Sequence, residues 1–161
     1  MKKRTWHYGN ERPKQPLHYK ECGLDDVFLA SGYRKVKTSY GDAVVIKDQD
    51  GLHAAIARHL VASKKALSGK EIRFLRKRMD CTQSGLARLI GVDSQTVARW
   101  EKGETENIPG PADRIIRVVY REFAKDPGGV MEMLEALESL DAPLSEMQLF
   151  EDTPTGWKAA A

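Results

Sequence analysis

Apolar residues recur at three- and four-residue spacing through most of the second half of the chain. Ile72, Leu75 and Met79 open this pattern, and similar patterns follow at about 82–90, 93–102, 112–124 and 130–140. Such spacing gathers apolar side chains on one face of an α-helix. We therefore predict five helices between residues 69 and 140.

The first half of the chain shows short β-prone runs separated by turn residues. Residues 27–29, 33–38 and 43–46 are rich in Val, Ile, Tyr and Thr, and Gly32 and Gly41 lie between them. Asp48 or Asp50 can then cap a helix whose apolar residues recur at helical spacing from Leu52 onward. This pattern predicts a small β-meander followed by a helix.

These patterns divide the chain into segments. We expect a flexible basic arm at 1–17, a small α/β module at 18–66, a helical domain at 67–125, an amphipathic helix at 126–145 and a flexible tail at 146–161. The fold class is α+β, mainly α. No internal repeat is visible.

The helical domain carries clear start and stop signals. Ser68 and Glu71 have the spacing of a capping box, while Thr82 and Asp93 are placed to cap the next two helices. Gly91 can end the second helix in the left-handed conformation that glycine adopts at little cost. Three short helices with a three-to-four-residue turn between the second and third form a helix-turn-helix arrangement.

The run TQSGLARLIGVDSQTVARWEKG, residues 82–103, resembles the helix-turn-helix of the Cro/phage-repressor (XRE) family. The match has no gap and includes Gln83, Ala87, Gly91 and the closing W-E-x-G. The resemblance implies a five-helix, lambda-repressor-like fold, with the DNA-binding helix-turn-helix domain at 67–125. It also implies a structural pair between Arg76 of the first helix and Glu101 at the end of the third.

One residue departs from the family pattern. Gly85 stands where a helix former is usual. We expect it to weaken the second helix by about 1 kcal/mol relative to alanine.

Small and apolar side chains lie where two helices of this domain must cross. Ala87 allows a close approach, Val97 can fill the gap, and Trp100 is expected in the core or hinge. The outward face of the third helix then consists of short polar residues and one arginine, which suit base edges in the major groove. The base-reading candidates are Ser94, Gln95, Thr96 and Arg99.

Other polar residues are better placed for the DNA backbone. Helix N-termini attract anions, so residues at the start of the second helix are expected to contact phosphate, together with exposed cations nearby. The phosphate candidates are Thr82, Gln83, Lys102 and Arg88. The alternative for both sets is an ordinary polar helix surface.

Charge is unevenly distributed along the chain, although the formal net charge is only +3. Residues 64–125 hold fourteen Lys/Arg against eight Asp/Glu, whereas residues 126–161 hold one against eight. A basic middle segment favours a polyanion partner, and a merely solvated charged surface is the alternative. The acidic segment would repel DNA and should lie away from the docking face.

The N-terminal module weakly resembles that of antitoxin-type regulators that bind zinc through two CxxC pairs. Cys22 with His18 could be the remnant of one pair, but the other ligands are missing, and structural zinc needs four. We expect no metal and no cofactor, and we interpret the histidines as surface or packing residues. The module would then bind a partner, such as a toxin protein, or support dimerisation.

Several classes of protein are disfavoured. The chain has no phosphate-cradling glycine loop, no HExxH, no nucleophile elbow and no recognisable catalytic pair, so we predict that it is not an enzyme. No apolar run is long enough to span a membrane, and two cysteines are too few for a disulfide scaffold. A cytoplasmic location is the simplest expectation.

The leading hypothesis is a sequence-specific regulator of transcription that binds double-stranded DNA with the helix at about 93–102. A single recognition helix buries little surface, so a homodimer on a palindromic operator is favoured. The dimer surface stays open between the N-terminal module and the acidic Leu/Met-rich helix at 130–140, which could equally dock on its own domain. The alternative function is an antitoxin that sequesters a toxin through the N-terminal module and regulates its own operon.

Overall fold

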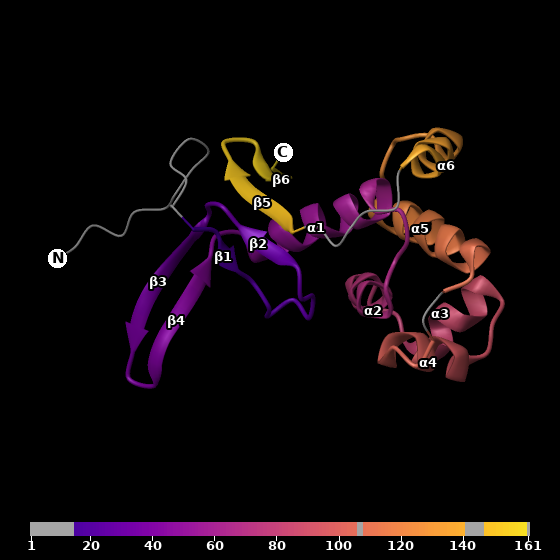
Figure 1. The fold of residues 1–161 in the computed structure, drawn as a ribbon, viewed down its shortest axis with the longest axis horizontal. Helices are drawn as coiled ribbons and strands as arrows, with labels where there is room; N and C mark the ends of the chain where they lie inside the picture. Colours follow the sequence, from indigo (N-terminus) through magenta and orange to yellow (C-terminus); the bar gives the residue numbers. More distant parts are fainter. Residues whose placement is uncertain (1–14, 106–107, 141–146, 161) are drawn as a thin grey trace. The chain divides into compact units, whose positions relative to one another are not determined.

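A computed structural model describes residues 15–105, 108–140 and 147–160. Within these residues the chain is α+β and mainly α, as the sequence predicts (Figure 1). It divides into two compact units, one formed by residues up to Ile56 together with those from Glu146 onward, and one formed by Ala57–Ser145. We call them the sheet unit and the helical unit.

The sheet unit contains two separate sheets. One is a hairpin of β3 (Tyr33–Thr38) and β4 (Gly41–Ile46). The other has the strand order β1-β2-β5-β6, formed by β1 (Leu17–His18), β2 (Val27–Leu29), β5 (Gln148–Thr153) and β6 (Gly156–Ala159). The strands were expected in a meander, but β2 pairs with β1 and β5 and not with β3.

The C-terminal residues correct the sequence interpretation most clearly. Residues 146–161 were expected to form a flexible tail, yet β5 runs parallel to β2 and β6 folds back antiparallel to β5 (Figure 1). Trp157 is 4% exposed, and its Nε1 donates to the backbone oxygen of Lys47 at 2.7 Å. Burial of this indole, with the pairing to β2, explains why the segment is ordered.

The helical unit is built on local signals that the sequence displays. Helix α1 (Gln49–Ser63) runs into it from the sheet unit, and it is followed by α2 (Gly69–Arg78), α3 (Gln83–Ile90), α4 (Ser94–Lys102), α5 (Gly110–Ala124) and α6 (Val130–Ser139). The capping box is present: Glu71 N donates to Ser68 Oγ at 3.3 Å, and Ser68 N donates to Glu71 Oε2 at 2.8 Å. The predicted helices of this unit are therefore confirmed.

Most core residues of the helical unit belong to the apolar helix faces that the sequence predicts, and further residues join them. Ile72, Leu75 and Val97 are fully buried, and Phe74 joins them although the pattern did not single it out. Helix α5 differs more, because Ile115 is 41% and Phe123 51% exposed although both belong to its apolar pattern. Helix α5 therefore has an apolar side that the unit itself does not cover.

Candidate nucleic-acid interface

The turn between α3 and α4 fixes the geometry of the two helices. Thr82 Oγ1 accepts from Gly85 N at 2.9 Å, and Asp93 Oδ1 accepts from Gln95 N at 2.7 Å, so each helix begins at a side-chain cap. Gly91 ends α3 with φ of 78°, a left-handed conformation in which a side chain would be strained. All three features match the sequence prediction.

Close packing holds the two helices in place. Ala87 is 2% exposed and Val97 is fully buried, as expected for residues at a helix crossing. The start of α2 approaches the end of α4 just as closely, because a Cβ on Gly69 would lie 1.7 Å from the carbonyl oxygen of Trp100. Helix α4 is therefore tightly packed against both α3 and α2.

The base-reading candidates occupy the solvent side of α4, to different degrees. Gln95 and Arg99 are exposed and one helical turn apart, so they share a face. Ser94 and Thr96 are only partly exposed. The structure therefore brings together an amide and a guanidinium, the two groups that recognise adenine and guanine bidentately.

The phosphate candidates fall into two groups. Arg88 and Lys102 are exposed cations on α3 and α4, and Thr82 is exposed at the start of α3 while its hydroxyl serves as the cap. Gln83 is partly buried, and its Nε2 donates to Glu101 Oε2 at 2.7 Å. Its amide is therefore committed, at least in part, to a contact within the domain.

Glu101 is the centre of a polar network that links three helices. Arg76 of α2 donates to its carboxylate through Nε at 2.5 Å and through Nη2 at 3.1 Å, and Arg76 Nη1 also reaches the Cys81 oxygen at 2.9 Å. The carboxylate is 4% exposed, which strengthens these charge-assisted bonds. The resemblance anticipated the Arg76–Glu101 pair, but the third member, Gln83, was assigned only to DNA.

The position of Gly85 explains its departure from the family pattern. A Cβ there would lie 3.0 Å from Cys81 Sγ and 3.1 Å from Thr82 Oγ1. Both distances are shorter than ordinary van der Waals contact, and Thr82 is the cap of this helix. The glycine leaves room for the cap, which offsets part of its low helix propensity.

A buried ion pair on α5 was not anticipated. Arg117 is fully buried on α5, and its Nε donates to Asp113 Oδ1 at 2.6 Å. Its Nη1 donates to the carbonyls of Leu60 and Val61, at 3.0 and 2.9 Å, near the end of α1. The i,i+4 spacing of Asp113 and Arg117 is visible in the sequence, but on a helix it usually marks a solvated surface pair.

The comparison with protein families decides the nature of this region. Residues 72–111 match the helix-turn-helix family model. This segment is a Cro/repressor-type helix-turn-helix domain. In separate comparisons, the chain matches no curated protein and no solved structure.

A helix-turn-helix domain of this type is a DNA-binding module of regulators and is not usually catalytic. The matched segment covers most of α2, all of α3 and α4 and the beginning of α5, and it contains every candidate contact residue named above. Among the described residues, no helix is both long and apolar enough to cross a membrane. The similarity of the N-terminal module to zinc-binding antitoxin regulators receives no support from the comparisons.

The side chains considered for zinc have other roles. Burial raises the pKa of the Cys22 thiol, and its Sγ donates to the backbone oxygen of Tyr19 at 3.7 Å. His18 stacks on Phe28 with ring centroids 4.4 Å apart, and His53 Nε2 bonds the Tyr19 hydroxyl at 2.9 Å. Within the described residues, no three His, Cys, Asp or Glu side chains gather into a metal-binding group.

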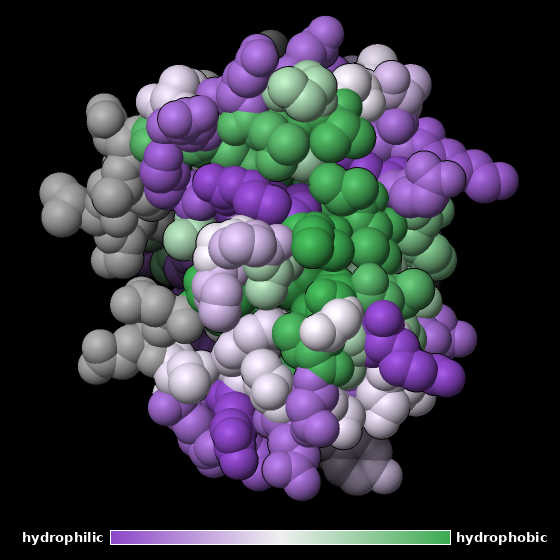
Figure 2. Space-filling model, turned by 90° about the vertical axis from the view of Figure 1, so that its right-hand side faces the viewer, coloured by the Kyte–Doolittle hydropathy of each residue, from purple (hydrophilic) through white to green (hydrophobic). Residues whose placement is uncertain are grey.

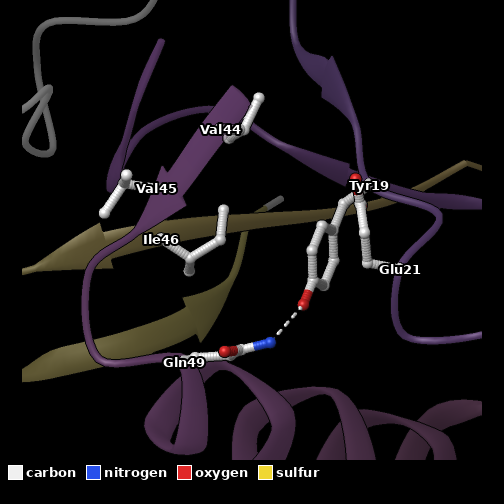
Figure 3. Close-up of a pocket in the computed structure, with 6 residues that line it drawn as sticks. All are labelled: Tyr19, Glu21, Val44, Val45, Ile46 and Gln49. Carbon is white, nitrogen blue, oxygen red and sulfur yellow. Dashed lines mark hydrogen bonds between the residues drawn. The ribbon is translucent and has the colours of Figure 1, made fainter. Parts of the chain in front are cut away.

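The sheet unit contains a pocket of about 300 Å³ beside β4 (Figure 3). Val44, Val45 and Ile46 of β4 line one side of it, and the side chains of Val44 and Ile46 lie on the side of the strand that faces Tyr19. The Tyr19 hydroxyl accepts from Gln49 Nε2 at 3.1 Å, and burial raises the pKa of this phenol, so it stays protonated at neutral pH. The pocket is lined by neutral groups except for Glu21, so it does not resemble an anion site.

Proposed function

We propose that this protein is a sequence-specific regulator of transcription that inserts α4 into the major groove of double-stranded DNA. The observation that carries the proposal is the pair of exposed side chains Gln95 and Arg99, held on a helix that the Glu101 network and the Val97 core keep fixed. Base readout depends on such fixed donors, because bidentate bonds tolerate little displacement.

Selection of bound fragments from random DNA tests this function. The full chain should enrich one motif, with affinity that falls steeply as the salt concentration rises. For a homodimer, the motif should be a palindrome whose half-sites lie about 10 base pairs apart, or a multiple of that. Failure to enrich any motif would overturn the proposal.

The variant Arg99→Ala should relax base choice at one operator position, with about 1–3 kcal/mol of discrimination lost there. The variant Lys102→Ala is the matched control, because Lys102 is an exposed cation on the same helix and should weaken all sequences evenly. Competition binding with single-base operator variants measures both effects. An even loss on every sequence after Arg99→Ala would contradict base reading by this residue.

We propose that the protein acts as a homodimer through the exposed side of α5. Ile115, the half-buried Val119 and Phe123 are spaced by four residues, so they form one stripe along this helix. Leu89 of α3 is 62% exposed, and Figure 2 shows apolar side chains gathered on the viewed face of the helical unit. A second copy is the occupant that an operator with two half-sites requires.

Helix α6 is a weaker candidate for the dimer surface. Val130 and Met131 are exposed there, but Glu132, Glu135 and Glu138 follow on the same ten-residue helix. In a two-fold interface the same patch meets itself, so these carboxylates would approach their own copies. Repulsion between like charges disfavours that arrangement.

An antitoxin function is the second candidate, and the pocket beside β4 favours it. The sheet unit is folded around its own core, and its pocket is not needed for base reading by α4. A toxin gene beside this one, whose product is neutralised on co-expression, would support the role. Such neutralisation should be lost when Val44 at the wall of the pocket is replaced by Glu.

A further inference from the structure

The β3–β4 hairpin carries exposed basic side chains on its first strand. Residues 33–46 hold three basic residues against one acidic residue, Asp42. Lys35 and Lys37 are both exposed and lie two positions apart on β3, so they project from the same face. Lys35 is opposite Val44 in the strand register, and Lys37 is opposite Asp42.

The tip of the hairpin is closed by its own hydrogen bonds and presents an aromatic ring. Thr38 Oγ1 donates to the Gly41 oxygen at 2.7 Å and accepts from Tyr40 N at 3.2 Å, which closes the turn from within. Tyr40 is nevertheless 99% exposed. An aromatic side chain held on a fixed turn loses little conformational entropy when it is buried against a partner, so this tip is suited to binding.

From these features we infer that the β3–β4 hairpin is a second DNA-contacting element, which binds backbone phosphates next to the operator; this inference rests on the proposed function. Lysine is depleted in protein–protein interfaces, whereas lysine and tyrosine side chains are frequent donors to phosphate. A two-stranded ribbon is also a shape that DNA grooves admit. The contact adds affinity and salt dependence without sequence preference, because phosphates are identical at every base pair.

The inference requires no fixed orientation between the two units, only that the hairpin reach the DNA held by α4. Helix α1 continues from the sheet unit into the helical unit, so the hairpin is tethered close to the DNA-binding domain along the chain. Tethering raises the local phosphate concentration that the hairpin meets once α4 is bound. Weak contacts of this kind are therefore effective even when the hairpin alone has low affinity.

The test measures operator affinity of the full chain as a function of salt. For the double variant Lys35→Ala/Lys37→Ala, the slope of log K against log salt should become shallower by about 0.9 for each phosphate that the variant no longer binds, with the preferred sequence unchanged. Tyr40→Ala should lower affinity at every salt concentration and leave the slope unchanged, because the phenol is uncharged. Asp42→Asn should strengthen binding, since it removes the carboxylate opposite Lys37.

A matched control separates hairpin contacts from net charge. Lys20 and Lys158 are exposed lysines of the same unit that lie off the hairpin, so Lys20→Ala/Lys158→Ala should leave the slope unchanged. The inference would be overturned if the Lys35/Lys37 variant still bound the operator with the wild-type slope of log K against log salt. The hairpin would then be a candidate binding surface for a protein partner. That result differs from failure of the proposed function, in which the unaltered chain enriches no operator.

Discussion

Replacing Arg117 with Ala is expected to lower the free energy of unfolding of the helical unit by about 3–5 kcal/mol, the cost of breaking a buried ion pair on one side. The guanidinium is fully buried and donates hydrogen bonds to the Asp113 carboxylate and to the backbone carbonyls of Leu60 and Val61. Its removal leaves these acceptors in an apolar interior. Among the described residues, the Leu67 amide, at 2.7 Å, and Arg114, at 3.0 Å, are then the donors left to the Asp113 carboxylate.

Urea unfolding followed by circular dichroism at the helical band measures this loss, because most of the helix lies in the helical unit. Arg73→Ala is the control: Arg73 is exposed on α2, and its loss should change stability by less than about 0.5 kcal/mol. The double variant Asp113→Leu/Arg117→Met should cost less than Arg117→Ala, because it also removes the buried carboxylate that Arg117→Ala leaves with fewer donors. A loss below about 1 kcal/mol for Arg117→Ala would contradict the assigned role.

The parts of the fold that could be predicted from the sequence are those that depend on residues close together along the chain. The caps at Ser68, Thr82 and Asp93 act within three residues, and Gly91 acts on its own backbone. Such caps depend only on neighbouring residues and on no distant contact, so they can be recognised from the sequence alone. The face of α4 could be predicted for the same reason, since helical spacing alone brings Gln95 and Arg99 together.

The parts that could not be predicted depend on distant segments. In the pairing of β5 with β2, Val27 lies opposite Gln148. No local pattern in the sequence indicates which distant strand a given strand will pair with. The contacts of Arg117 and Gln83 within the domain were missed for another reason: both residues are polar, and a polar residue on a helix is normally assigned to the surface. Their burial becomes visible only when the carbonyls at the end of α1 and the Glu101 carboxylate are in place.

The double variant Ile115→Glu/Phe123→Glu should convert the protein to a monomer and lower its affinity for a palindromic operator by about 10²–10⁴-fold. Two half-sites bound by one dimer gain affinity of this order over separate binding events, because the second contact becomes intramolecular. Both side chains are exposed in the single chain, at 41% and 51%, so the substitutions leave the core of the helical unit intact. Sedimentation equilibrium measures the state of assembly, and a gel shift with full and half operators measures affinity.

Two further substitutions make the result specific to α5. Met131→Glu probes α6, where Met131 is 67% exposed, and Met147→Glu probes the sheet unit, where Met147 is 59% exposed. Both proteins should remain dimers with unchanged operator affinity if the second copy packs on α5. The double variant should also bind an isolated half-site as well as the unaltered chain does, since α4 and its network are untouched. A stable dimer that keeps full operator affinity after Ile115→Glu/Phe123→Glu would rule out this surface, and dissociation after Met131→Glu would move the interface to α6.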